Sequence, residues 1–240
     1  MSSGISLLNN ILANLVIIKF VPKESYFSAE NIESKATEIS KGLQSAAQKR
    51  RIPFSLKDSA LLVLDMQRYF LEPNSHAYIP SARAILPGIQ ALVQAYGKLG
   101  LPIIFTRHSN SSQDSGMMRR WWRDTIRANT PLSEIEAGLD QSKGMVVQKS
   151  QYDAFYRTAL EERLHERRVR QVVICGVMTH LCCETTARAA FVRGFEVFFL
   201  IDGTATYNAE FHRAALLNLA HGFAILSRVD EILTEAKHAN

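Results

Sequence analysis

Cysteine is scarce in this sequence, and the few cysteines are clustered. Three occur in 240 residues, at positions 175, 182 and 183. An odd number of cysteines in so short a stretch does not match the disulfide framework of a small secreted protein. We therefore expect free thiols and a cytoplasmic location.

Long hydrophobic runs are also missing. An apolar stretch at residues 11–20 contains Asn14, follows no basic segment and precedes no small-residue cleavage pattern. It is too short to span a bilayer. We interpret it as a helix or arm that packs on the domain or on a second subunit, and we expect no membrane partner.

No strong excess of one charge is present either. Lysine and arginine number 28 against 23 acidic residues, which gives a net charge of +5. The densest basic runs, 49–51 and 163–170, lie in predicted helices, where a solvated face is the better interpretation than a nucleic-acid patch. The sequence thus favours a small-molecule substrate and no nucleic-acid partner.

What the sequence does contain is an alternation of short apolar runs with amphipathic stretches. Runs of about five apolar residues are typical of strands buried on both faces of a parallel sheet. Alternation with helices indicates right-handed crossovers and a three-layer α/β domain. The predicted strands are 60–64, 101–106, 145–147, 171–175 and 197–201, with a weaker sixth at 222–226, and the predicted helices between them are 82–98, 154–168, 180–193 and 209–220.

Two segments stand apart from this alternation. Residues 1–55 form a predicted amino-terminal helical extension or arm, with a helix over 34–51, and residues 56–240 form the domain. Residues 109–143 form a long polar excursion between two strands. Excursions at the carboxyl end of a strand often cover a binding site, which is what we expect here.

Three reactive side chains follow different predicted strands. Asp65 ends the first strand, Lys149 follows the third, and Cys182 lies on the turn after the fourth. In open parallel sheets this carboxyl edge is where ligands bind. A cysteine in the first turn of a helix, near a lysine, should have a lowered pKa and react as a thiolate. Asp65 could accept the thiol proton and return it to a leaving group.

Each of these residues also has an ordinary interpretation. A strand-terminal aspartate is often a cap or loop anchor, a lysine after a strand is usually solvated, and cysteines are commonly buried as small hydrophobic residues. Cys175, inside an apolar strand, is assigned to the core. The residues alone leave the catalytic and the structural interpretations open.

Three motifs resemble those of the isochorismatase-like cysteine hydrolases. Residues 64–70, LDMQRYF, are similar to the family's aspartate motif, and 149–155, KSQYDAF, to its lysine motif. Residues 176–188, GVMTHLCCETTAR, resemble its cysteine motif, and 202–206, DGTAT, the segment after the next strand. The likeness covers about residues 58–234, with the motifs in the family's order.

This resemblance implies a Rossmann-like domain with a six-stranded parallel sheet and a triad of Asp65, Lys149 and Cys182. It also implies a cis peptide at Val177–Met178, which would direct the Met178 N–H, with that of Cys182, toward an oxyanion. Cys183 is then assigned to packing. Oligomerisation, as a dimer or tetramer, is a further expectation.

The branches of the family differ in chemistry. Nicotinamidases carry a metal on an Asp-x-His pair and further histidines, whereas this chain has Thr-Arg-His-Ser-Asn at 106–110, so no metal and no cofactor are expected. Isochorismatases often have glycine where Cys182 stands, and a thiol there favours an acyl-enzyme. The sequence around 66–70 and 149–155 is nonetheless closer to the isochorismatase branch.

Other residues are expected to bind substrate rather than react. His180 is two positions from Cys182, so the two side chains should diverge and a Cys–His dyad is disfavoured. Either tryptophan of the excursion could line a pocket while a neighbouring arginine pairs with a substrate carboxylate, and packing is an equally good interpretation. The predicted substrate-binding residues are Gln67, His108, Trp121, Tyr152 and Phe155.

Three functions follow as hypotheses. The first is hydrolysis of a small amide or related C–N bond through an acyl-enzyme on Cys182. The second is the isochorismatase reaction, in which Asp65 protonates a vinyl ether and pyruvate is released. The third is a binding protein without catalytic activity.

Overall fold

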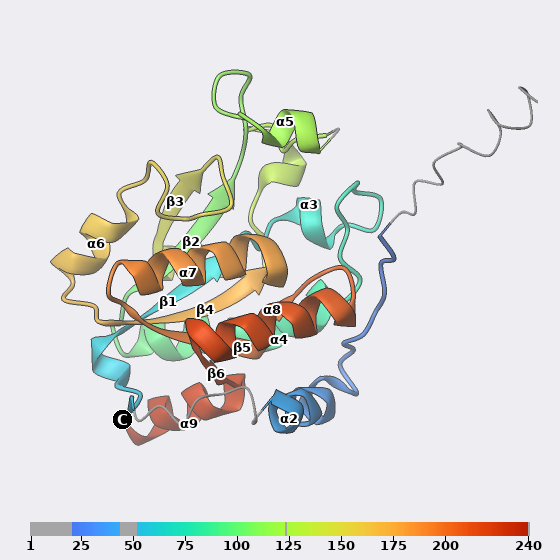
Figure 1. Cartoon of the computed structure of the whole chain (residues 1–240). Coiled ribbons are helices and arrows are strands. Elements are labelled where there is room, and N and C mark those ends of the chain that lie inside the picture. Colours follow the sequence, from blue (N-terminus) through green and yellow to red (C-terminus); the bar gives the residue numbers. More distant parts are fainter. Residues whose placement is uncertain (1–20, 44–51, 123, 240) are drawn as a thin grey trace, which may run out of the picture.

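A computed structural model describes residues 21–43, 52–122 and 124–239 (Figure 1). Its centre is a six-stranded sheet in which every pair of neighbours is parallel, in the order β3-β2-β1-β4-β5-β6. This confirms the predicted α/β class and sheet. The strands are β1 (Ser59–Leu64), β2 (Ile103–His108), β3 (Met145–Lys149), β4 (Gln171–Val177), β5 (Glu196–Ala205) and β6 (Ile225–Ser227).

Burial explains why the short apolar runs become strands. Every residue of β1 and β4, at the centre of the sheet, is buried, whereas the edge strand β3 is buried only at Val147 and Lys149. Central parallel strands have both faces covered, so they require continuous apolar sequence. Continuous apolar runs of the sequence therefore form the central strands β1 and β4.

Helices cover both faces of the sheet. Alternate β1 residues point to opposite sides: Leu61 and Val63 pack in a core with α4 and α9, and Leu62 and Leu64 pack in a core with α6, α7 and α8. In Figure 1, α7 and α8 cross the near face of the sheet. The helices are α2 (Ile32–Leu43), α3 (Arg68–Leu71), α4 (Ala82–Lys98), α5 (Met118–Trp121), α6 (Leu160–Glu166), α7 (Glu184–Val192), α8 (Ala209–Gly222) and α9 (Val229–His238).

Two predicted helices are shorter than expected, and both differences lie at the carboxyl edge of the sheet. The helix predicted over 154–168 begins only at Leu160, because the preceding loop is held in another conformation by a hydrogen bond from the Ala154 N–H to Thr186 Oγ1 (3.1 Å). The helix predicted over 180–193 begins only at Glu184, because residues Thr179–Cys183 form a π-helical turn before it. Helix α9 was not predicted.

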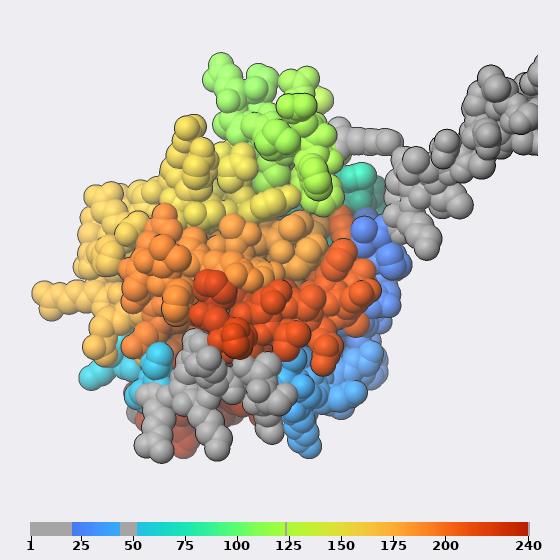
Figure 2. Space-filling model, in the orientation of Figure 1, coloured from blue at the N-terminus to red at the C-terminus, as the bar shows by residue number. Residues whose placement is uncertain are grey.

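The amino-terminal segment packs on the domain. Tyr26 and Phe27 are buried in the same core as α4 and α9, and Figure 2 shows residues 21–43 in blue against the rest of the surface. Helix α2 accounts for the first part of the helix predicted over 34–51, whose remainder lies outside the described residues, as does the apolar stretch 11–20. In the described part of the chain, no helix combines the length and apolarity that crossing a bilayer requires.

Candidate active site

The register of the sheet brings the predicted reactive residues to one edge. Leu64 pairs with Gly176, so Asp65 lies beside the turn that leads to Cys182. His108 pairs with Lys149 at the ends of β2 and β3. Lys149 is two strands away from Asp65, about 10 Å at the usual strand spacing. Only a long side chain can cross β2 to reach it.

The Lys149 ammonium stands at the centre of the site. Its Nζ is 2.7 Å from Asp65 Oδ2, and the two side chains have no exposed surface. The same Nζ is 3.5 Å from Cys182 Sγ and donates to the carbonyl oxygen of Gln151 at 2.8 Å. The sequence-predicted residues Asp65, Lys149 and Cys182 are thus brought together, and one buried cation contacts both the carboxylate and the sulfur.

Asp65 is fixed by its neighbour on β2. The Thr106 hydroxyl donates to Asp65 Oδ1 at 2.5 Å and accepts the Asp65 N–H at 3.0 Å. Asp65 has a positive φ of 49°, a backbone conformation that non-glycine residues rarely adopt. Two hydrogen bonds to one buried hydroxyl hold this conformation and leave Oδ2 directed at Lys149. Sequence reasoning did not identify Thr106, since a threonine inside an apolar strand gives no signal of its own.

The turn that carries Cys182 depends on close contact between β4 and β1. Gly176 has a φ of 114°, and a Cβ there would overlap the carbonyl oxygen of Leu64. The peptide bond between Val177 and Met178 is cis. The Met178 carbonyl then accepts the N–H groups of Leu181 and Cys183, both at 3.1 Å, and this closes the π-helical turn.

The local electrostatics give Asp65, Lys149 and His108 different protonation states near neutral pH. The Lys149 ammonium, with a smaller effect from His108, lowers the pKa of Asp65 below its usual value despite complete burial, so this carboxyl is ionised. The carboxylate of Asp65 and the sulfur of Cys182 in turn raise the pKa of Lys149. Burial, with a contribution from Lys149, lowers the pKa of His108 to about 4, and its imidazole is neutral.

The prediction that Cys182 has a lowered pKa and is a thiolate is wrong for the resting site. Burial raises the pKa of this thiol to about 12, which outweighs the opposing effect of Lys149, and the Asp65 carboxylate raises it further. The resting site therefore holds a carboxylate, an ammonium and a neutral thiol. The desolvation that the sequence could not show decides the sign of this shift.

Three of these residues could also be considered as metal ligands. Donor atoms of Asp65, His108 and Cys182 lie within 4.8 Å of one another. Lys149 Nζ contacts all three, at 2.7 Å from Asp65 Oδ2, 3.4 Å from His108 Nδ1 and 3.5 Å from Cys182 Sγ. An ammonium in that position would repel a metal cation and already engages the lone pairs that would bind one. The donor set does not fit a metal ion.

A cavity opens above the sulfur. Its walls are mainly aromatic and apolar, as is usual for small-molecule sites. Cys182 and His108 lie among its walls, and Asp124 contributes a carboxylate. The lining residues are Tyr69, Phe70, His76, Ala77, His108, Asn110, Met118, Trp122, Asp124, Thr125, Ile126, Tyr152, Met178, Leu181, Cys182 and Tyr207.

The polar excursion 109–143 supplies one wall of this cavity. Met118, Trp122 and Ile126 are its apolar contributions, and Asn110 Oδ1 accepts a hydrogen bond from His108 Nε2 at 3.0 Å. In Figure 1 the excursion, with α5, stands above the ends of β2 and β3. Of the neighbouring arginines, Arg123 lies outside the described residues.

The predicted substrate-binding residues divide into two groups. His108 and Tyr152 line the cavity, and the Tyr152 hydroxyl accepts the indole N–H of Trp122 at 2.6 Å. Trp121 does not line it: its side chain is 73% exposed and points to solvent, so Trp122 takes the place expected for it. Which of two adjacent tryptophans faces inward depends on the short helix α5, which the sequence did not reveal.

Gln67 and Phe155 also lie outside the cavity. The Gln67 side chain accepts the His108 N–H at 2.8 Å and donates to the carbonyl oxygens of His108 and Ser133, so its amide holds two loops together. The Phe155 ring is buried against Phe195, with ring centroids 6.0 Å apart. Both side chains support the site from behind.

His180 faces away from the sulfur. Its Nδ1 is 2.6 Å from Thr206 Oγ1, and its ring stacks on Phe211 with centroids 4.4 Å apart. Burial lowers the pKa of His180 to about 4. Cys183 points into the core beneath α7. The expected divergence of His180 from Cys182 and the packing position of Cys183 match this geometry.

Comparison with known proteins assigns the domain. A family model of the isochorismatase domain matches residues 59–231. Nicotinamidase 3 of Arabidopsis thaliana is 42% identical over 192 residues, which cover 77% of this chain and 91% of that protein. The chain belongs to the isochorismatase-like cysteine hydrolase family.

Two further relatives have lower sequence identity to the chain. A cysteine hydrolase from Pseudomonas syringae pv. phaseolicola 1448A superimposes with a TM-score of 0.76 at 28% identity, over 80% of this chain and all of that one. The isochorismatase of Bacillus subtilis (strain 168) is 27% identical over 184 residues, which cover 75% of this chain and 59% of that protein. The chain is thus an isochorismatase-family hydrolase.

Proposed function

We propose that this protein hydrolyses the amide bond of a small, uncharged substrate through a covalent acyl-enzyme on Cys182. The observation that carries the proposal is the contact of one buried ammonium, Lys149, with both the Asp65 carboxylate and the Cys182 sulfur at the base of an apolar cavity. The thiol supplies a nucleophile. The isochorismatase reaction, in which a vinyl ether is protonated directly, does not need one, so the thiol favours amide hydrolysis.

Acylation begins from the neutral thiol. Asp65, the ionised carboxylate, takes the proton as Cys182 Sγ attacks the carbonyl carbon, so a C–S bond forms while the C=O π electrons move to oxygen. The oxyanion is stabilised by the N–H groups of Met178 and Cys182. When it collapses, the C–N bond breaks and the protonated Asp65 gives its proton to the leaving nitrogen.

Deacylation repeats the sequence with water. Asp65 accepts a proton from water as its oxygen attacks the thioester carbon, the C–S bond breaks, and the proton returns to the sulfur. The net reaction consumes one amide and one water and yields one carboxylic acid and one amine or ammonia. Lys149 remains protonated throughout, since its contacts raise its pKa, and it offsets the negative charge that moves between carboxylate and sulfur.

The cavity favours a flat, uncharged acyl group. Tyr69, Phe70, Trp122, Tyr152 and Tyr207 supply aromatic surface around the sulfur, and aromatic rings bind planar groups through their faces and edges. The identity of 42% to a nicotinamidase supports an aromatic carboxamide, and nicotinamide is the first substrate to test.

The isochorismatase reaction is less well supported. Isochorismate carries two carboxylates, whereas the described lining residues include the Asp124 carboxylate and no lysine or arginine. The amine of Lys149 is already paired with Asp65. We therefore place isochorismate among the alternatives to be assayed.

The test is a panel of small amides, ureides and isochorismate, assayed by ammonia or pyruvate release. On an amide that the wild type hydrolyses, Cys182→Ala should lose at least about a thousandfold in kcat. Cys183→Ala is the matched control, because it removes the adjacent buried thiol and should keep turnover. Full activity of Cys182→Ala would refute the acyl-enzyme, and pyruvate release from isochorismate alone would refute the amidase. A protein that turns over nothing but binds a panel member would support the binding hypothesis.

A further inference from the structure

Residues 22–27, which we call the strap, cross the rim of the cavity. They lie outside residues 59–231, the part of the chain that the family model matches. Lys23 Nζ donates to the carbonyl oxygen of His76 at 2.7 Å and stands 4.7 Å from the centre of the Tyr207 ring. His76 and Tyr207 both line the cavity. One side chain of the strap therefore ties two walls of the substrate cavity together.

The strap is bonded along its length to the start of α8. The Glu24 N–H donates to the Tyr207 carbonyl at 2.8 Å, and a Glu24 carboxylate oxygen accepts the Ala209 N–H at 2.5 Å. The Asn208 side chain donates to the Pro22 carbonyl at 3.1 Å. These bonds hold the chain from the Tyr207 carbonyl to Ala209, so the position of the Tyr207 ring depends on the strap.

Tyr26 extends the connection to the turn before the nucleophile. Its buried hydroxyl accepts the Thr206 N–H at 3.0 Å. Thr206 follows β5, and Thr179 directly follows Met178. Thr179 Oγ1 is in addition 3.0 Å from Nδ1 of the buried His212. Tyr26 thereby links the end of β5, through the His212 imidazole on which its ring packs, to the first residue of the turn that presents Cys182.

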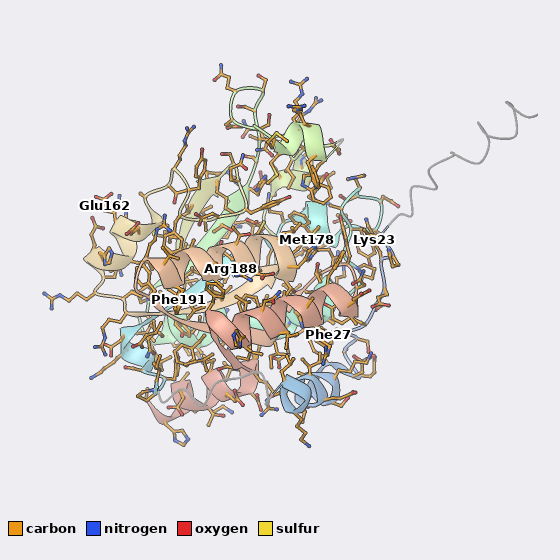
Figure 3. The ribbon with its side chains drawn as sticks, viewed as in Figure 1. Lys23, Phe27, Glu162, Met178, Arg188 and Phe191 are labelled. Carbon is orange, nitrogen blue, oxygen red and sulfur yellow. The ribbon has the colours of Figure 1, made fainter. Side chains whose placement is uncertain are left out.

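Aromatic packing fixes the Tyr26 ring itself. Its centroid lies 5.2 Å from that of His212, and Phe27 packs edge-on against the same imidazole at 5.3 Å. The Phe27 N–H donates to the buried Ser81 hydroxyl at 3.1 Å. In Figure 3, Lys23 and Met178 lie toward the same side of the molecule, with Phe27 beneath them.

From these contacts we propose that the strap is part of the active-site framework, with two separate positioning residues. Tyr26, through Thr206 and His212, holds the end of β5 and the turn that begins at Thr179 in place for the reaction at Cys182. Lys23 holds the Tyr207 and His76 walls in place for substrate binding. Neither residue touches the reacting atoms. The inference rests on the proposed function of Cys182 and adds to it a dependence on residues outside the family match.

The two residues should affect different kinetic constants. Tyr26→Phe keeps the packed ring but leaves the buried Thr206 N–H without its acceptor, so kcat should fall about tenfold or more with little change in KM. Lys23→Met keeps the chain length but removes the link between the walls, so KM should rise several-fold with kcat retained. Lys23→Arg, which can donate to His76 and stack on Tyr207, should restore most of the loss.

The experiment measures kcat, KM and the rate at which iodoacetamide alkylates Cys182, with the modified cysteine assigned by peptide mass spectrometry. Tyr156→Phe and Lys41→Met are the matched controls, since Tyr156 and Lys41 are exposed and lie outside the cavity lining. We expect Tyr26→Phe to alkylate at a changed rate and the controls to match the wild type. Circular dichroism verifies that each variant is folded.

Failure of this inference can be told from failure of the proposed function. If Tyr26→Phe and Lys23→Met are folded and keep wild-type kcat and KM while Cys182→Ala is inactive, the strap has no positioning role and the proposed function stands. If the wild type hydrolyses no panel member, the alkylation rate still tests Tyr26. An unchanged rate in folded Tyr26→Phe then overturns its assigned role.

Discussion

Replacing Lys149 by methionine tests whether the ammonium at the centre of the site is also a large contributor to stability. The substitution keeps an unbranched side chain of similar length and removes the charge. Asp65 Oδ2, 2.7 Å from Nζ and fully buried, would lose its counterion, while Cys182 and the Gln151 carbonyl would lose a polar contact. Removing one partner of a buried ion pair costs about 3–5 kcal/mol. That is a large share of the roughly 5–15 kcal/mol that stabilises a typical domain.

The loss should depend on pH in a defined direction. In the wild type the pKa of Asp65 is lowered, so its stabilising contribution is complete above its unfolded value and is lost only as the pH falls through the folded value. The pKa of Lys149 is raised, so its contribution is lost only as the pH rises through a strongly alkaline folded value. Without Lys149, burial would raise the pKa of Asp65. The folded variant would then lose about 1.4 kcal/mol per pH unit between the unfolded and folded values of that carboxyl.

Urea denaturation of wild type and Lys149→Met, from about pH 5 to about pH 8, measures this difference. The gap in unfolding free energy should widen as the pH rises. The double variant Asp65→Asn/Lys149→Met, which removes both charges, should be more stable than Lys149→Met at the upper end of the range. A loss below about 1 kcal/mol, as for an exposed pair, or a gap that is constant with pH, would refute the reasoning.

Further predictions concern the support of the site. Thr106→Val removes the hydroxyl that holds Asp65, so kcat should fall about tenfold or more at constant KM. The control Thr234→Val, on α9, should leave kcat and KM unchanged. A wild-type kcat in Thr106→Val would contradict this role of the hydroxyl. The site groups with shifted pKa values titrate below about 5 or above about 9, so kcat/KM should not change with pH between those limits. The pH profile is measured for the wild type and for His76→Gln, which removes the other histidine of the cavity wall. A transition of kcat/KM near neutral pH in both proteins would contradict this prediction. Gly176→Ala should lower the free energy of unfolding by several kcal/mol or prevent folding. Gly42→Ala, in α2 with open space at the Cβ position, should leave stability unchanged or raise it by up to about 1 kcal/mol. Thermal melts measure both variants, and equal melting temperatures would refute the close contact at Gly176.

Much of the fold follows from local sequence because the central strands are apolar on both faces. The runs that became β1 and β4 could be recognised from length and composition, and the helix predicted over 82–98 coincides with α4. Where polar tertiary contacts override helical periodicity, the sequence misled. The loop before α6 is the clearest case, since the Ala154 N–H bonds to Thr186, whose proximity only the folded chain creates.

The site could be predicted as far as its reactive residues. Strand ends in a parallel sheet converge, so the meeting of Asp65, Lys149 and Cys182 follows from where each lies along the chain. The protonation state of Cys182 could not be predicted, because it depends on the water that folding removes. Thr106 and the strap at 22–27 were also beyond the sequence, because their roles consist of bonds to residues distant along the chain.

Trapping the covalent intermediate tests the central proposal most directly. Wild-type protein in steady-state turnover of an amide substrate, quenched with acid and examined by peptide mass spectrometry, should carry the acyl group on Cys182, and Cys183→Ala should carry the same adduct. Cys182→Ala should carry none. Rapid amide hydrolysis without any adduct on Cys182, together with sustained turnover in Cys182→Ala, would contradict the account.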